Sequence, residues 1–226
     1  AQATALLAES ARLAQARALL TEISDNLRIQ ALVAYANNEF DEATTLFTQS
    51  LAMSQRENET EGIAFSCYGL GLLALQEKNY GLATTHLQES LRLWQQRGDR
   101  HYTAVAYCSL GRVALAQGDA PSAATYLRAS LTLYQEMVDK LGAAHAIEGV
   151  AQYLKRASVA VQLLGAAHTL RQTIGAPVPP VEQNEYTQLA DRLRSALGSK
   201  HFEAHWAEGA RLSYEQAIKL ALNHCT

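Results

Sequence analysis

Cysteine, proline and long apolar runs are scarce in this sequence. Of its 226 residues three are cysteine and four are proline, and no two cysteines stand in a CxxC spacing. That pattern argues against a disulfide framework or a zinc cluster and suggests a reducing, cytoplasmic setting. No apolar run approaches the roughly 18 residues of a membrane-spanning helix, and the N-terminus lacks a signal-peptide pattern. We therefore expect a soluble, cytoplasmic protein.

Charge of one sign is also lacking. The formal net charge is −3, and no run of Lys and Arg is longer than two. Such a chain offers little attraction to a phosphate backbone, so we expect no direct binding of nucleic acid and no membrane binding. A hydrophobic share of 48% provides material for a core, and Ala, Leu, Gln, Glu and Arg dominate the long segments. These features predict an all-α fold.

Catalytic and cofactor motifs are missing as well. There is no GxxxxGK[ST] loop, and Gly69-Leu70-Gly71 falls inside an expected helix rather than after a strand. His201 and His205 are four apart, but the glutamate between them stands one position too late for a zinc-protease helix, so packing is the main interpretation and a metal site the alternative. We expect no enzymatic activity, no catalytic residue, no cofactor and no metal.

What the sequence does contain is an internal repeat with a period of about 40 residues. Small residues on one helix face let a second helix approach closely. Short polar turns such as Gly118-Asp119 separate the two halves of each repeat. The repeat predicts helical hairpins stacked into an α-α superhelix. Three series of small residues carry it: Ala3, Ala43, Ala83 and Ala123; Ser10, Ser50, Ser90 and Ser130; Ala31, Gly71, Gly111 and Ala151.

The repeats are expected to occupy residues 1–175. Residues 1–20 form the second helix of a truncated first repeat, and its uncovered face (Ala3, Leu7 and Ser10) predicts possible self-association through the N-terminal end. Cys67 and Cys108 occupy near-equivalent places in successive repeats and are expected to be buried. The complete repeats are predicted over 21–57, 58–98, 99–138 and 139–175.

A C-terminal helical cap, continuous with the solenoid, is expected over residues 176–226. Ala176-Pro177-Val178-Pro179-Pro180 cannot continue a helix. Ser213 and Gln216 form a capping-box pattern. Three shorter helices are predicted near 181–197, 200–208 and 213–223.

Two resemblances to known families follow from these residues. The pattern of Leu70, Gly71, Asn79, Tyr80, Ala83, Leu87, Ser90 and Leu91 resembles the tetratricopeptide repeat, although the period is about 40 rather than 34 and the closing proline is missing. The C-terminal part is similar to the tail of large bacterial regulators, the STAND-type ATPases and LuxR- or AfsR-like transcriptional regulators. The residues that carry this second resemblance are Leu163-Leu164-Gly165-Ala166-Ala167, Ile174-Gly175-Ala176-Pro177, Pro180, Tyr186, Leu197-Gly198, Phe202, Trp206, Glu208-Gly209, Leu212-Ser213 and Ala217.

Tetratricopeptide superhelices line their concave face with the first helix of each hairpin, and the resemblance implies the same here. Its mixture of apolar, aromatic and charged side chains suits a peptide or helix better than a phosphate-rich ligand. The alternative is that these side chains pack against the neighbouring repeat. The candidate partner-binding groove comprises Arg28, Tyr35, Phe65, Tyr68, Arg112, Glu148, Gln152 and Lys155.

The leading functional hypothesis is a protein–protein or interdomain interaction scaffold. The resemblance to bacterial regulators implies a sensor or autoinhibitory role, with a protein or peptide partner, or with upstream ATPase and DNA-binding domains of the same polypeptide. The alternative is a receptor domain that binds a small-molecule or peptide inducer.

Overall fold

A computed structural model describes residues 2–225, apart from the side chains of residues 2–8, 10, 11, 13, 14, 16 and 17. Over this range the chain forms eleven helices and no strand, which confirms the predicted all-α helical-repeat fold. The predicted open face of Ala3, Leu7 and Ser10 lies outside the described side chains. No helix in the described range combines the length and the hydropathy needed to cross a membrane.

Helices follow one another through short turns. They are α1 (Gln2–Ala36), α2 (Phe40–Arg56), α3 (Thr60–Gln76), α4 (Tyr80–Arg97), α5 (Arg100–Ala116), α6 (Ala120–Met137), α7 (Lys140–Tyr153), α8 (Ala157–Ile174), α9 (Pro180–Leu197), α10 (Ser199–Ala210) and α11 (Tyr214–Leu222).

The helices of the repeats from α2 to α7 start at regular intervals of 20 residues. Helices α2 to α7 begin at positions 40, 60, 80, 100, 120 and 140. Just before the last three starts, a carboxylate of Asp99, Asp119 or Asp139 accepts a backbone N–H from the first turn at 2.9–3.1 Å. In the turn before each of the six helices one residue is left-handed, which reverses the chain: Asn38, Asn58, Lys78, Gly98, Gly118 and Val138.

The small residues of the repeat are packing positions, as predicted. Ala43, Ala83 and Ala123 are completely buried. A Cβ at Gly71 would lie 2.7 Å from Leu87 Cγ on the next helix, and the equivalent position of the following repeat is just as crowded. Neighbouring helices therefore approach closely because these side chains are small.

The predicted helix boundary near residue 20 does not occur. Helix α1 runs without interruption from Gln2 to Ala36. The stretch 15–26 contains neither glycine nor proline, so nothing in it stops the helix. Residues 2–36, which the repeat pattern divided between two helices, therefore form one long helix.

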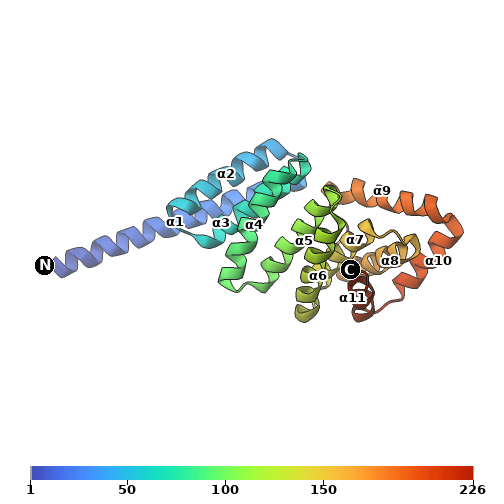
Figure 1. Ribbon diagram of the computed structural model, residues 1–226. Coiled ribbons are helices and arrows are strands. Elements are labelled where there is room, and N and C mark those ends of the chain that lie inside the picture. The colour runs from blue at the N-terminus through green and yellow to red at the C-terminus, as the bar shows by residue number, and fades with distance from the viewer. Residues whose placement is uncertain (1, 226) are drawn as a thin grey trace. The chain divides into compact units, whose positions relative to one another are not determined.

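The chain divides into two compact units, Ala1–Leu93 and Trp94–Thr226, with the boundary inside α4. In the first unit α2 packs against α1 and α3, around Ala31, Phe47 and Leu73. In the second unit α5 to α8 form two successive hairpins that share a larger core, and Trp94 is almost completely buried. Figure 1 shows the antiparallel course of the helices within each unit.

The three predicted C-terminal helices form, and they lie in the same compact unit as α5 to α8. Helix α10 packs closely on α8 because Gly165 and Gly209 carry no side chain at the crossing. Helix α11 begins with the predicted capping box of Ser213 and Gln216. The Arg128 guanidinium donates hydrogen bonds to the backbone carbonyl of Leu222, the last residue of α11, and to that of Cys225 just after the helix. In Figure 1, α9 and α10 wrap around α8 and α11 returns toward α6 and α7.

Candidate partner-binding surface

Two of the candidate residues in the first unit lie together. The Arg28 guanidinium lies over the Phe65 ring, 5.3 Å from its centroid, and Nη2 pairs with Asp25 Oδ1 at 2.6 Å. Glu59 adds a longer ion pair of 3.9 Å to Nη1. A planar guanidinium stacked on an aromatic face and held by carboxylates is restricted in its rotamers. Arg28 and Phe65 therefore form one ordered patch between α1 and α3.

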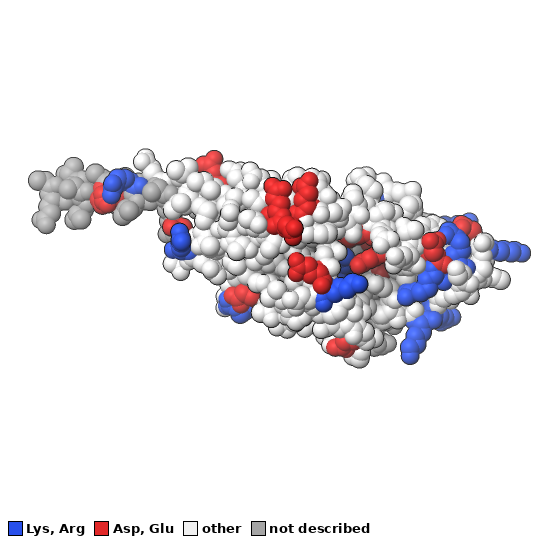
Figure 2. All heavy atoms as spheres, turned by 90° about the horizontal axis from the view of Figure 1, so that it is seen from above, with Lys and Arg blue, Asp and Glu red and all other residues white. Residues whose placement is uncertain are grey.

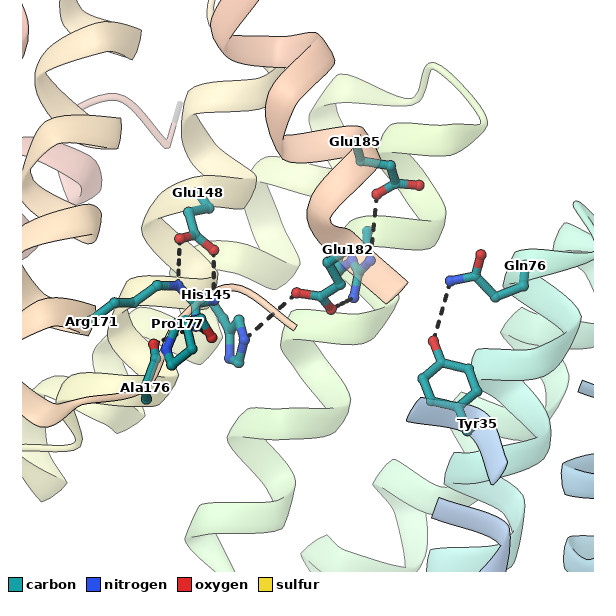
Figure 3. Close-up of polar contacts among 10 residues, drawn as sticks. Tyr35, Gln76, His145, Glu148, Arg171, Ala176, Pro177, Glu182 and Glu185 are labelled. Atoms are coloured by element: carbon teal, nitrogen blue, oxygen red, sulfur yellow. Dashed lines mark hydrogen bonds and ion pairs between the residues drawn. The ribbon is translucent and has the colours of Figure 1, made fainter. Parts of the chain in front are cut away.

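The two candidate tyrosines of this unit are half-buried. The Tyr35 hydroxyl accepts a hydrogen bond of 3.2 Å from Gln76 Nε2, and its ring lies 5.9 Å from that of Phe40 (Figure 3). Tyr68 lies on α3, on the same helix as Gln76. Half-buried tyrosines offer apolar area together with a polar tip, which is the character of many interface anchors.

In the second unit Arg112 of α5 is occupied by the C-terminal region of the chain itself. Its Nη1 pairs with Glu182 Oε1 at 2.5 Å, and Nη2 lies 3.5 Å from Glu185 Oε2. Both glutamates belong to α9 (Figure 3). The Arg112 and Glu182 side chains are about one-fifth exposed, so the ion pair is largely shielded from water and is screened less than a surface pair.

Glu148 of α7 is engaged in the same region. Arg171 of α8, with only 3% of its side chain exposed, makes a bidentate pair with it at 2.7 and 2.9 Å. The other arm of the Arg171 guanidinium donates to the carbonyls of Ala176 and Pro177, each at 3.4 Å (Figure 3). Arg171 therefore connects α7 to the proline-rich segment that precedes α9.

The last two candidates lie near the C-terminal end of α7. The backbone carbonyl of Gln152 accepts a hydrogen bond of 3.1 Å from Arg192 of α9. Lys155 is exposed in the short turn between α7 and α8. The structure thus brings Arg112, Glu148 and the Gln152 backbone together under α9, and leaves Lys155 outside this cluster.

The pKa values of two titratable groups beside Arg112 are shifted. Burial lowers the pKa of His145 below its ordinary 6.5. Burial would raise the pKa of Glu182, but the positive charges of Arg112, His145 and Arg171 outweigh it and hold that pKa below its ordinary value. At neutral pH the site therefore contains a Glu182 carboxylate between the Arg112 cation and a neutral imidazole, whose Nε2 lies 3.7 Å from Glu182 Oε2.

Sequence reasoning missed His145, Arg171 and Glu182. Arg171 offered a signal, because it stands seven positions after Leu164 and four after Ala167, on the apolar face of its helix. A charged residue at such a position indicates a buried ion pair. Glu182 offered none, since its partner Arg112 is far away in the sequence.

On the face of the molecule shown in Figure 2, the basic side chains of the described residues do not form a broad surface. On the face shown in Figure 2, acidic side chains lie among the basic ones over the described part of the chain. This distribution agrees with the formal net charge of −3.

Of the cysteines and histidines singled out by the sequence, both cysteines are buried and His205 is ion-paired. Cys67 and Cys108 are buried, as predicted, and burial raises the pKa of the Cys67 thiol to about 11 and that of Cys108 to about 12. Thiols with such values are weak nucleophiles at neutral pH. His205 pairs with Glu208 at 2.9 Å. Within residues 2–225 no three His, Cys, Asp or Glu side chains are placed to hold a metal ion.

A surface hollow of about 320 Å³ lies apart from the candidate residues, on α8, α10 and α11. Its apolar wall comes from Leu212 and Leu220, and its rim carries Glu208 and Lys219. The four lie outside the predicted groove.

Comparisons with known proteins agree with the repeat. Residues 62–136 match the family model of the tetratricopeptide repeat, so the chain contains a tetratricopeptide-like region. Proteins named as HTH-type transcriptional regulators, from Mycobacterium bovis and from two strains of Mycobacterium tuberculosis, are 37% identical to it over 79 residues. That match covers 35% of this chain and 9% of each relative. The chain therefore corresponds to a small part of these relatives.

Proposed function

We propose that this chain is the protein-binding repeat region of a larger bacterial transcription regulator, in which it acts as a sensor or autoinhibitory element. The tetratricopeptide match over residues 62–136 is the observation that carries the proposal, because stacked helical hairpins of this type generally act as interaction scaffolds without catalytic activity. The partial match to proteins named as HTH-type regulators supports the larger context. The partner is a protein or peptide, or another domain of the same polypeptide.

The side chains of the first unit support a protein partner. Arg28 stacked on Phe65, with Tyr35 and Tyr68 half-buried on the same pair of helices, combines the residue types that contribute most to protein interfaces. Their contacts hold the guanidinium and one phenol in place, which lowers the entropic cost of binding.

The experiment is a titration against the regulator's own remaining domains. The full gene is first read for an ATPase or DNA-binding domain, and the purified remainder is then titrated with this chain by calorimetry. Tyr68→Ala should weaken binding by about 1–3 kcal/mol while the helical content stays unchanged. A gene without such domains contradicts the regulator context.

A matched control comes from the exposed Gln88 of α4. Gln88→Ala should leave the affinity unchanged. Arg128 is unsuitable for this purpose, because its guanidinium holds the C-terminal carbonyls and its loss would loosen α11. Loss of affinity in Gln88→Ala with full affinity in Tyr68→Ala would show that binding uses another face.

A further inference from the structure

Helix α9 contacts Arg112 and Gln152, in the second-unit part of the surface that the tetratricopeptide resemblance assigned to a partner. Its first turn places the Glu182 carboxylate against Arg112 of α5, with His145 of α7 on the other side (Figure 3). A second carboxylate, Glu185, approaches the same guanidinium. The candidate site in this unit thus already holds an acidic helix, supplied by the chain's own C-terminal region.

Apolar packing holds α9 less firmly than it holds α8 and α11. Leu193 is its one fully buried side chain, whereas α8 buries ten residues and the nine-residue α11 buries four. Tyr186, Leu189 and Leu197 are partly buried. Since burial of apolar area is the main force that holds a helix in place, α9 depends unusually on its polar contacts.

Not every buried polar atom between α9 and the helices under it has a hydrogen-bond partner. His145 Nε2 and the Tyr186 hydroxyl are buried under α9 without a hydrogen-bond partner. A buried polar atom without a partner costs free energy that water would restore if the helix moved away. The docked state of α9 is therefore stabilised by the Glu182–Arg112 ion pair and by the Arg192 hydrogen bond to the Gln152 carbonyl, and it is weakened by two unmet hydrogen bonds.

A glycine with a positive backbone φ stands before and after α9. Gly175, at a φ of +66°, precedes the segment of Pro177, Pro179 and Pro180, and Gly198, at +77°, separates α9 from α10. The first connection is held by the two 3.4 Å hydrogen bonds from Arg171. Release of α9 would leave α10 and α11 packed on α8, because each makes direct contacts with it.

We propose that α9 is a displaceable internal ligand, anchored by Glu182 in the site formed by Arg112 and His145, and that a partner helix of the same pattern binds there by replacing it. The partner carries an acidic residue in its first turn, followed at the fourth, seventh and eleventh positions by an aromatic and two leucines, as Glu182, Tyr186, Leu189 and Leu193 do. A helix lying in a groove is read at this spacing. The identity of the partner rests on the proposed function, whereas the release of α9 does not.

The first experiment measures amide hydrogen exchange in the whole chain. Glu182→Gln should accelerate exchange across α9 at least tenfold and leave α10 and α11 unchanged. The matched control is Glu203→Gln, which has the same charge change and removes an exposed ion pair between α10 and Arg194 of α9. It should have no effect. Unchanged exchange in α9, or equal acceleration of α9, α10 and α11, would overturn the proposal, because α9 would then be a permanent part of the core.

The second experiment uses α9 itself as the probe. A fluorescent peptide of residues 179–197 is titrated against the parent chain and against Glu182→Arg, in which repulsion from Arg112 releases the internal helix. The peptide should bind the variant at least tenfold more tightly than the parent, and the same peptide carrying Glu182→Gln should bind at least tenfold more weakly. If circular dichroism shows that Glu182→Arg has lost helix, the titration uses the milder Glu182→Gln chain, with the same expectation.

These two experiments test the release of α9 independently of the proposed function. The probe comes from the chain itself, so failure to find a regulator partner leaves the expected exchange and peptide affinities unchanged. Equal affinity of the peptide for parent and variant, or equal affinity of the two peptides for the variant, would show that Glu182 anchors no displaceable ligand.

Discussion

The hydroxyl of Ser130 donates a hydrogen bond of 2.9 Å to the backbone carbonyl of Ala104, on the preceding helix. The equivalent hydrogen bond occurs in the first unit, where the Ser50 hydroxyl donates to the carbonyl of Ser24 at 3.2 Å. Ser90 holds the equivalent place in the repeat between them and is completely buried, but its hydroxyl has no partner. The serine series of the sequence thus joins helices in two repeats and leaves an unmet hydrogen bond in the third.

Replacing these serines should have opposite effects on stability. Ser130→Ala should lower the free energy of unfolding by about 1 kcal/mol, because a buried hydrogen bond is lost. Ser90→Ala should be neutral or stabilising, because it removes a buried hydroxyl that has no partner. Urea unfolding of each variant tests both values. Equal destabilisation by the two substitutions would contradict the different bonding of the two hydroxyls.

Adding a side chain at specific glycines of the helix crossings should lower the stability of the fold. A Cβ at Gly165 would lie 2.4 Å from the backbone oxygen of Trp206, and one at Gly111 would lie 2.8 Å from Leu127 Cγ. Gly165→Ala and Gly111→Val should each cost roughly 1–3 kcal/mol by overpacking, seen as a lower thermal midpoint. The control is Gly81→Ala, which has nothing within 4 Å of the new Cβ and should stabilise α4 by about 0.5–1 kcal/mol. A stable Gly165→Ala chain would show that α8 and α10 separate easily.

Val138 should be a site of backbone strain. It follows α6 with a φ of 56°, a conformation that costs a β-branched residue free energy, and its side chain is largely exposed. Glycine stands at the equivalent position of the preceding turn, at Gly118. Val138→Gly should therefore raise the free energy of unfolding by about 1 kcal/mol, and Gly118→Val should lower it by a similar amount. A decrease in stability for Val138→Gly would show that glycine's greater freedom in the unfolded chain outweighs the relief of strain.

Acid should weaken the region under α9. The pKa of His145 and that of Glu182 are both lower in the folded chain, so the unfolded state binds protons more readily in each case. Stability should be greatest above pH 6.5, the ordinary pKa of His145, and decline first below that value and again below 4.5, that of Glu182. Glu148, Arg171, Glu185 and Tyr186 face the same site.

Urea midpoints measured between pH 8 and pH 4 test this order. His145→Gln should remove the first decline, and Glu182→Gln should reduce the second. If His145→Gln and the parent chain gave superimposable profiles between pH 7 and pH 5, burial of the imidazole would have no influence on acid stability.

Apart from the predicted N-terminal face of Ala3, Leu7 and Ser10, exposed apolar side chains near the C-terminal end of α1 offer a second face whose part in self-association can be measured. Ile29 and Val33 lie four apart on this helix and are 60% and 57% exposed. If this face mediates association, replacing both with serine should lower the sedimentation coefficient at high protein concentration. If sedimentation velocity shows monomers for both chains, association through Ile29 and Val33 is contradicted.

The sequence by itself determined the helices and their spacing. Local signals were sufficient for this, because each capping aspartate, each left-handed turn residue and each small packing residue acts within its own hairpin. The helix boundaries of the C-terminal part followed for the same reason, from the proline segment and the Ser213 capping box. The continuous α1 was missed because the repeat pattern predicted a turn where no turn-forming residue stands.

Only the tertiary structure decided what lies on the candidate surface. Arg112 and Glu182 stand far apart in the sequence, and Glu148 and Arg171 belong to different helices. Periodicity could indicate that Arg171 is buried in an ion pair, but it could not indicate which residue is the partner in either pair. Glu148 and Arg171 meet because α7 packs on α8, whereas Arg112 and Glu182 meet because the chain, after Gly175 and the prolines, brings the first turn of α9 to the side chain of Arg112 on α5. Hydrophobic periodicity shows which face of a helix is buried, but the partner of a charged side chain is chosen by how distant segments pack.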